Sequence, residues 1–305
     1  AIMVYQPDRH VSQAFAKMCS SIDTPRSLAA HLMFLHGEHL QLAKLEIDAA
    51  NYLEHEFHRF RDDYLVTEYL SKFEGLNTGV DTKAVALQAW LASEETCRLT
   101  NERIRGIYDG SDIPAEILDI VSRAQSKIEG CIGTHVKWAK VLNRFKWGPG
   151  ATSSLKGEAA GLDTKLLEKQ ISVTQEALPL LRAAMATDYA WLRARGISAS
   201  GPTSLLPHEF QVVSGSRGVT VKKNAKTDRF IAAEPSGNVF LQLGFGTLLR
   251  QCLLRNGIDL NDQTVNQRLA ESALDDGLAT VDLRAASDTI TTAAVWLLLP
   301  FSWAS

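Results

Sequence analysis

The chain has 305 residues, 45% of them hydrophobic, which is enough for one large or two medium-sized domains. Its 32 basic and 35 acidic residues give a formal net charge of −3, which excludes an overall basic surface for nucleic acid, so any such surface must be local. Four scattered cysteines without a CxxC pair argue against a zinc ribbon or a disulfide scaffold, and we expect neither a membrane-spanning segment nor a signal peptide.

Apolar residues at three- and four-residue spacing predict helices within residues 26–75, 83–106 and 163–195. Another helix is predicted after Pro114, because proline suits a first helical turn, and one more within 257–277. The first stretch holds five histidines without the HExxH spacing of a zinc site. We therefore expect histidines on solvated helix faces rather than a metal site; they are His31, His36, His39, His55 and His58.

Residues 135–157, "HVKWAKVLNRFKWGPGATSSLKG", combine basic and aromatic side chains and contain no acid. Basic groups follow phosphates and aromatic rings stack on bases, so this segment is a candidate nucleic-acid-binding surface. An amphipathic helix with a solvated basic face, ended by Gly148-Pro149-Gly150, explains the pattern equally well. The basic residues of interest are Lys137, Lys140, Arg144 and Lys146.

A second basic cluster lies in "SRGVTVKKNAKTDRFIAAEPSGN", residues 216–238. Its flanks are typical of two strands, which places the cluster on a hairpin or a connecting loop. The ammonium groups of the lysines and the forked N–H donors of an arginine can hold a polyphosphate there. The plainer alternative is that these residues simply lie on an exposed hairpin tip. The cluster consists of Arg217, Lys222, Lys223, Lys226 and Arg229, with Asp228 as its one acid.

The next motif, "GFGTLL" at residues 244–249, lacks the third glycine of a dinucleotide-binding fingerprint and lies in an apolar run that suits a helix.

Near the end of the chain, "ATVDLRAASDTIT", residues 279–291, places two aspartates around a turn. β-Branched residues predict a buried strand over 279–283, and an apolar pattern predicts a helix over 289–299. A carboxylate at the end of a buried strand needs a partner, for which a hard divalent cation or a hydrogen-bonded cap can serve. Asp282 is thus a candidate metal ligand, and Asp288 equally suits a helix N-cap.

Three strings between Val221 and Trp303 are distinctive, "KNAKTDRFIAAEPSGN", "GIDLNDQTVNQRLA" and "LATVDLRAASDTIT", and "RFKWGPGAT" lies upstream. They resemble the replicase β-subunit of levivirus-type single-stranded RNA bacteriophages, an RNA-directed RNA polymerase, and in particular its Qβ-like forms. The resemblance implies an α+β, right-hand polymerase fold. It divides the chain into a largely helical N-terminal and fingers region (1–200), fingers with a basic nucleotide-contacting loop (201–276) and the start of the palm (277–305).

The implied reaction is the attack of an RNA 3′-hydroxyl on the α-phosphate of a nucleoside triphosphate, with two Mg²⁺ ions, or Mn²⁺, in the complete enzyme. The resemblance assigns Asp282 as the catalytic carboxylate and a metal ligand, and the backbone carbonyl of Leu283 as a second ligand. Ser287 and Asp288 are implied to recognise the ribose 2′-hydroxyl. The implied triphosphate contacts are Lys222, Lys223, Lys226 and Arg229, and residues 135–157 are implied to line the template channel.

Two positions depart from the family pattern. Lys222 stands where proline is common, which makes the loop less rigid and more basic. Arg284 stands where a small serine is usual, and its long side chain can pair with Asp288, reach a phosphate or disturb the site.

The family's second palm motif and its Gly-Asp-Asp turn are expected after Ser305, so the chain reads as truncated. We expect residues 1–305 alone to be inactive and, because the apolar stretch 293–303 lacks its palm cover, prone to self-association. The alternative is a non-catalytic RNA-binding remnant of a polymerase. For the complete enzyme the resemblance implies an RNA template, nucleoside triphosphates, the cytoplasm of a bacterial host and no membrane. It further implies host elongation factors Tu and Ts and a ribosomal protein as partners.

Overall fold

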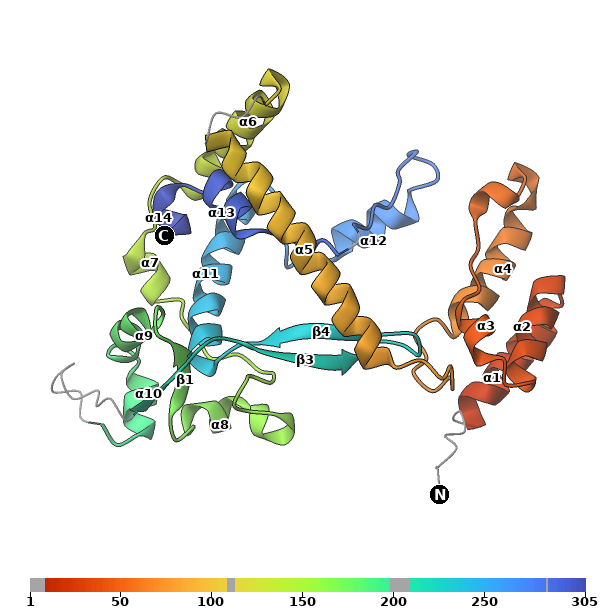
Figure 1. The fold of residues 1–305 in the computed structure, drawn as a ribbon, viewed down its shortest axis with the longest axis horizontal. Helices are drawn as coiled ribbons and strands as arrows, with labels where there is room; N and C mark the ends of the chain where they lie inside the picture. The colour runs from red at the N-terminus through yellow and green to blue at the C-terminus, as the bar shows by residue number, and fades with distance from the viewer. Residues whose placement is uncertain (1–8, 109–112, 198–208, 284) are drawn as a thin grey trace. The chain divides into compact units, whose positions relative to one another are not determined.

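A computed structural model describes residues 9–108, 113–197, 209–283 and 285–305, in which helices predominate over strands (Figure 1). This content is consistent with the expected α+β class. None of the described helices is both long and apolar enough to cross a membrane. The helices are α1 (Arg9–Ile22), α2 (Pro25–Leu35), α3 (His39–Ala43), α4 (Phe57–Tyr69), α5 (Thr82–Tyr108), α6 (Ala115–Ile132), α7 (Trp138–Leu142), α8 (Leu162–Leu166), α9 (Leu178–Met185), α10 (Tyr189–Ala194), α11 (Ser236–Arg255), α12 (Thr264–Glu271), α13 (Thr292–Leu298) and α14 (Phe301–Ala304). The strands are β1 (Ile171–Thr174), β2 (Phe210–Val213), β3 (Arg217–Lys222) and β4 (Asp228–Ala233).

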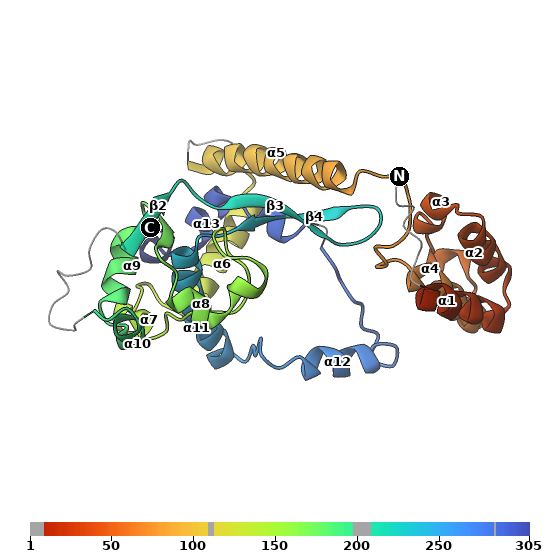
Figure 2. The ribbon, with the colours of Figure 1, turned by 90° about the horizontal axis from the view of Figure 1, so that it is seen from below.

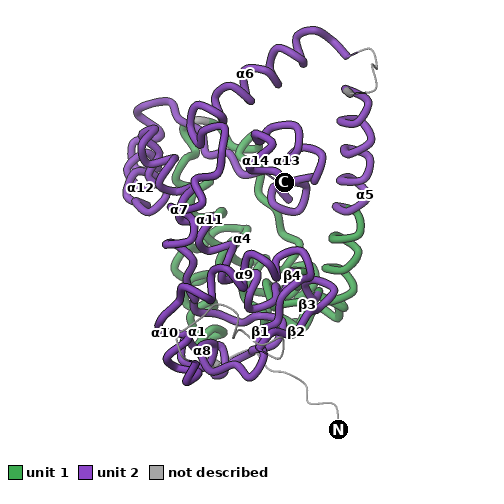
Figure 3. The backbone as a smooth tube through the Cα atoms, turned by 90° about the vertical axis from the view of Figure 1, so that its left-hand side faces the viewer, with its two compact units in different colours: residues 1–92, 218–231 green, residues 93–217, 232–305 purple. Residues whose placement is uncertain are grey.

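The chain divides into two compact units, residues 1–92 with 218–231 and residues 93–217 with 232–305 (Figure 3). It passes from one unit to the other within α5 and within the β3–β4 hairpin. The three-part division inferred from the resemblance stays a prediction.

In the first unit, α1, α2 and α4 surround a core that includes Phe15, Ala30 and Val66. The start of α2 is fixed by a capping box, because the Thr24 hydroxyl accepts the Ser27 N–H at 3.1 Å and the Ser27 hydroxyl accepts the Thr24 N–H at 2.9 Å.

The predicted helices within residues 26–75 are confirmed as α2, α3 and α4, but the chain between α3 and α4 is not α-helical. Residues 49–51 and 54–56 form short 3₁₀ turns instead. Asp48 accepts the N–H of Ala50 at 2.9 Å, and Glu56 accepts the N–H of Leu53 at 3.0 Å. These local bonds compete with a continuous helix.

His39 is buried rather than solvated, because its Nδ1 accepts the Asn77 N–H at 3.0 Å and its ring lies against Phe34. The other four histidines are exposed or half-buried.

In the second unit, β1 pairs in parallel with β2, with Ile171 opposite Phe210. The helices predicted within 163–195 are present as α8, α9 and α10, but β1 interrupts them, because "ISVT" is rich in β-branched residues and its first three are buried. The core of the unit lies between β1, α9 and α11. Gly237 allows α11 to approach, since a Cβ there would lie 3.0 Å from the Ser172 carbonyl oxygen.

The predicted helices after residue 82, after Pro114 and within 257–277 are confirmed as α5, α6 and α12. The apolar C-terminal stretch contacts α6 and the segment after it, because Gln125 donates to the Leu297 carbonyl at 2.6 Å and Trp303 donates to the Gly133 carbonyl at 2.9 Å. Phe301 remains 77% exposed.

Candidate functional site

The basic cluster lies on the β3–β4 hairpin, which confirms the two predicted strands. Asn224 closes the connecting loop, because its Oδ1 accepts the N–H of Lys226 at 2.9 Å and that of Thr227 at 3.0 Å, and its own N–H donates to the Thr227 carbonyl at 3.2 Å. An asparagine that bonds to its own downstream backbone fixes a turn without needing glycine. The loop that carries the lysines therefore has a defined backbone.

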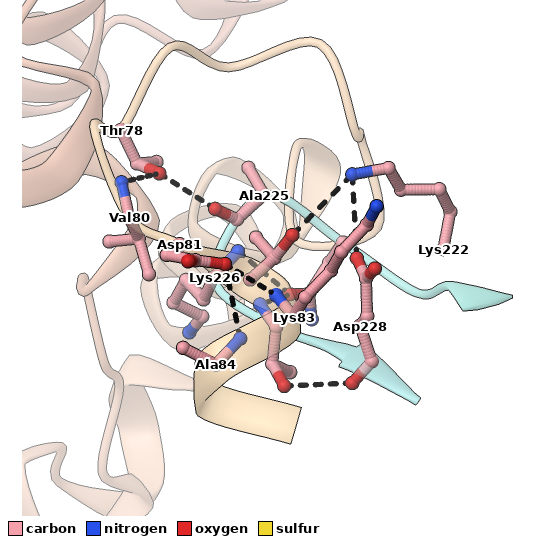
Figure 4. Close-up of polar contacts among 12 residues, drawn as sticks. Thr78, Val80, Asp81, Lys83, Ala84, Lys222, Ala225, Lys226 and Asp228 are labelled. Atoms are coloured by element: carbon pink, nitrogen blue, oxygen red, sulfur yellow. Dashed lines mark hydrogen bonds and ion pairs between the residues drawn. The ribbon is translucent and has the colours of Figure 1, made fainter. Parts of the chain in front are cut away.

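The tip of the hairpin is attached to the segment that precedes α5. Ala225 is 6% exposed and packs in the core of the first unit. Its carbonyl accepts the Thr78 hydroxyl at 2.7 Å, and that hydroxyl accepts the Val80 N–H at 3.3 Å (Figure 4). Asp81 caps the following helix by accepting the N–H groups of Lys83 and Ala84, each at 3.1 Å.

Lys222 has two partners in this region. Its Nζ lies 3.4 Å from Oδ1 of Asp228 and 3.4 Å from the Thr82 hydroxyl (Figure 4). The Lys222 side chain is 59% exposed, whereas that of Asp228 is 2% exposed. Within the described ranges, the same Oδ1 has no hydrogen-bond donor, so the ammonium group is its one nearby compensation.

The remaining predicted triphosphate contacts carry uncompensated charge. Among the described residues, no acid lies within ion-pair distance of Lys223, Lys226 or Arg229. Lys223 and Arg229 are exposed, while Lys226 is half-buried. Lys226 and Asn224 line a cavity of about 160 Å³, whose other walls come from α3, α4 and the turn after α4.

Residues 279–283 do not form the predicted strand. They are irregular chain, and Val281 and Leu283 are 78% and 70% exposed. A strand requires a neighbour for its backbone groups, and in the part of the chain that is described the only paired strands are β1 with β2 and β3 with β4. Asp282 consequently lies on exposed backbone rather than at the end of a buried strand.

Ser287 and Asp288 lie in a 3₁₀ turn, in which the Ser287 hydroxyl donates to the Asp288 carboxylate at 3.3 Å. The Asp288 backbone carbonyl accepts a long hydrogen bond from the Cys97 thiol at 3.4 Å. The alternative role of Asp288 as a helix N-cap is wrong. Because Ile290 is extended, the helix starts afresh at α13, and the Thr291 hydroxyl accepts the N–H of Ala294 at 3.1 Å. Arg284 lies outside the described residues.

The residues that are present fit a hard divalent cation only in part. Asp282 offers an exposed carboxylate, and carboxylate and carbonyl oxygens are the donors that Mg²⁺ prefers. Where the chain is described, however, no three His, Cys, Asp or Glu side chains come together in a way that could hold a metal ion. Asp282 can thus be one ligand but does not make a complete site.

The basic segment over 135–157 contains a helix of one turn, α7, and its exposed cations are Lys137, Lys140, Lys146 and Lys156. Arg144 differs, because its Nε and Nη2 donate to Oε1 of Gln251 at 2.9 and 2.6 Å and its Nη1 donates to the Lys140 carbonyl. These bonds give Arg144 a structural role between α7 and α11.

The three aromatic residues of this segment are not equally available for stacking. Phe145 and Trp147 are half-buried against Phe240, with ring centroids 5.8 and 4.8 Å from its ring. Trp138 is 48% exposed and meets Phe245 edge-on. The structure therefore leaves Trp138 as the accessible ring of this segment.

Sequence reasoning missed the residues that hold the hairpin in place. Thr78 and Thr82 lie well over a hundred positions before their partners, and no local pattern marks them. Asp228 could have been recognised from the sequence, because it is the one acid within a basic cluster.

Residues 20–305 match the protein family described as RNA replicase, beta-chain. The RNA-directed RNA polymerase subunit beta of Enterobacteria phage SP is 41% identical over 246 residues, and that of Escherichia virus Qbeta is 38% identical over 246 residues. These alignments cover 80% of this chain and 40% and 39% of the relatives. The RNA-directed RNA polymerase beta chain of Enterobacteria phage GA is 32% identical over 266 residues, which are 86% of this chain and 48% of that protein. The chain thus spans less than half the length of these relatives.

Proposed function

Because the chain belongs to the RNA replicase beta-chain family, we propose that residues 1–305 supply the fingers and the first palm segment of an RNA-directed RNA polymerase. The substrates of such an enzyme are an RNA template and nucleoside triphosphates. The observation that carries the proposal is the β3–β4 hairpin, a loop of defined backbone on which three basic side chains have no acidic partner among the described residues.

Lys223, Lys226 and Arg229 bind the triphosphate in this proposal. Phosphoryl and nucleotidyl transfer rest mainly on positioning and charge neutralisation, so cations fixed before the substrate arrives contribute most. The Asn224 turn and the buried Ala225 provide that preorganisation. Lys222 differs from these three cations, because it already has two partners.

In the same proposal, Asp282 and the carbonyl of Leu283 hold Mg²⁺, or Mn²⁺, with a second ion completed by carboxylates from elsewhere in the enzyme. When bound, these ions would neutralise the charge that develops on the attacking and leaving oxygens. Ser287 and Asp288 lie in one exposed turn and recognise the ribose 2′-hydroxyl. Lys137, Lys140 and Lys146 contact the RNA backbone through their exposed ammonium groups. By the same resemblance, the enzyme works in the cytoplasm of a bacterial host with elongation factors Tu and Ts and a ribosomal protein.

The test is template-directed nucleotide incorporation by the protein encoded by the longest reading frame that contains residues 1–305. We expect incorporation in the parent, at least a 100-fold loss in Asp282→Asn, and RNA affinity within about twofold of the parent. Lys17→Ala, an exposed change on α1, is the control that keeps both properties. RNA binding by the parent without any incorporation would favour the polymerase remnant, and incorporation by Asp282→Asn at the parental rate would refute the role of Asp282.

A further inference from the structure

The contacts of Lys222 differ from those of the other cations on the hairpin. Lys222 is the last residue of β3 and Asp228 is the first residue of β4, so their contact spans the mouth of the loop. Thr82, the first residue of α5, lies at 3.4 Å from the same ammonium group. Lys222 therefore connects both strands of the hairpin to the start of α5 (Figure 4).

Asp228 supplies the reason for this arrangement. Its side chain is 2% exposed, and its Oδ1 lacks a hydrogen-bond donor among the described residues. Removal of the one cation beside this desolvated carboxylate would leave a buried charge without compensation, which is strongly unfavourable. The Lys222 ammonium group is thereby drawn back over the mouth of the loop.

We propose that Lys222 and Asp228, together with Thr82, are positioning residues that hold the loop 223–227 in its binding conformation, and that Lys222 is not itself a triphosphate ligand. The proposal rests on the function inferred above, in which the neighbouring cations bind the triphosphate. An ion pair across the mouth of the loop restricts the backbone of residues 223–227 before the nucleotide binds.

The direction in which Asp228→Asn changes triphosphate affinity distinguishes a positioning role of Lys222 from direct binding of the triphosphate by Lys222. The substitution removes a negative charge next to four basic residues and releases Lys222. If Lys222 were a phosphate ligand, triphosphate affinity would rise. If the pair positions the loop, affinity falls although the local charge becomes more positive, because the loop must then be ordered on binding.

The experiment uses the protein encoded by the longest reading frame that contains residues 1–305, and measures its binding of β,γ-methylene ATP with Mg²⁺ by isothermal titration calorimetry. We expect Kd to rise about fivefold in Asp228→Asn and in Lys222→Met, and no further in the double variant, because each change breaks the same contact. Lys222→Arg should remain within about twofold of the parent, since it keeps the charge and the reach. Lys17→Met is the matched control for the loss of one lysine.

Hydrogen exchange of the amides of residues 223–228 provides a readout without nucleotide. Exchange should be faster by about tenfold in either single variant and equal in the double variant. Tighter binding by Asp228→Asn, or additive effects in the double variant, would overturn the proposal. If the parent binds no triphosphate, the proposed function fails. The comparison of hydrogen exchange in the single and double variants still tests whether Lys222 and Asp228 hold the loop. If Asp228→Asn does not fold, Lys222→Met and Thr82→Val decide, because they keep the buried carboxylate and change only the ammonium group beside it or the hydroxyl that accepts from that ammonium group.

Discussion

Trp90 on α5 stacks on Phe230 of β4, with ring centroids 4.4 Å apart and planes inclined by 20°. Gly218 on β3 leaves room for the same ring, because a Cβ at that position would lie 2.4 Å from Cζ of Phe230. The stack thus joins the first part of α5 to the hairpin. The ribbon shows that part of α5 running past the hairpin (Figure 2). It complements the polar contacts of Thr78 and Thr82 with the loop.

Gly218→Ala should therefore destabilise the first unit by about 1–3 kcal/mol, because the added methyl group pushes Phe230 out of its stack with Trp90. Urea unfolding followed by tryptophan fluorescence measures the effect. In a Phe230→Leu background the same substitution should cost much less, since the ring that it meets is gone. Equal costs in the two backgrounds would show that the clash is not with this ring.

The hairpin and the family could be predicted from the sequence because short stretches of residues are enough to indicate each of them. "GVTV" and "RFIAAE" specify strands within one short segment, and the strings "KNAKTDRF" and "TVDLRAASD" identified the replicase family that the comparisons confirm. The strand expected at residues 279–283 failed for the opposite reason. A strand forms only when its backbone can pair with another strand. A run of β-branched residues does not indicate whether that second strand is present.

For the candidate site, the sequence predicted which side chains carry charge but not what compensates them. Lys222 and Lys223 are adjacent and look equivalent, yet only Lys222 has the buried Asp228 as a partner. Arg144 likewise looked like a phosphate contact, although its donors are bound to Gln251 and to a backbone carbonyl. Such differences arise from residues that are distant in the sequence and therefore become visible only in the fold.

Two glycines of "GFGTLL" offer a matched comparison within α11. A Cβ at Gly244 would lie 2.2 Å from the ring of Phe145 and 3.0 Å from its backbone nitrogen, whereas a Cβ at Gly246 would meet nothing within 4 Å. Replacing a helical glycine by alanine gains up to about 1 kcal/mol from helix propensity. Gly246→Ala should thus raise the free energy of unfolding by up to about 1 kcal/mol, while Gly244→Ala should lower it by about 1–3 kcal/mol.

Thermal unfolding of the two variants in parallel measures this difference. An increase in both would contradict the close approach of α11 to Phe145. The expected result would show that Gly244 is needed for the packing of α11 against Phe145 and not for binding a dinucleotide.

Neutralising Lys137, Lys140 and Lys146 together should weaken RNA binding and reduce its salt dependence. Each lost phosphate contact lowers the slope of log K against log salt by about 0.7 for single-stranded RNA, so three contacts lower it by about 2. Fluorescence anisotropy with a labelled single-stranded RNA over a range of salt concentrations measures the slope. An unchanged slope would mean that the basic face is only solvated.

Arg144→Ala is expected to behave differently from the three lysine changes. It removes the bonds to Gln251 and to the Lys140 carbonyl, so its main effect should be a loss of stability of about 1–2 kcal/mol. The melting temperature and the salt slope distinguish the two roles. A loss of about 0.7 in the salt slope without any change in melting temperature would instead identify Arg144 as a phosphate contact.

The thiol of Cys19 makes stability depend on alkaline pH. Cys19 is 3% exposed in the core of the first unit, and burial raises the pKa of its thiol from 9.0 to about 11, only partly offset by a backbone hydrogen bond. Between these values the unfolded chain has lost this proton and the folded chain keeps it, so the unfolded state binds fewer protons and stability falls as pH rises. The stability that the protonated thiol contributes is complete below pH 9.0, and about 2 kcal/mol of it is lost by pH 11.

Urea unfolding of the parent and of Cys19→Ala at pH 8 and pH 11 isolates the effect of the thiol, since the other titrating groups are common to both proteins. The parent should lose about 2 kcal/mol more than Cys19→Ala over this interval. Equal losses would show that the thiol ionises as readily in the folded core as in the unfolded chain.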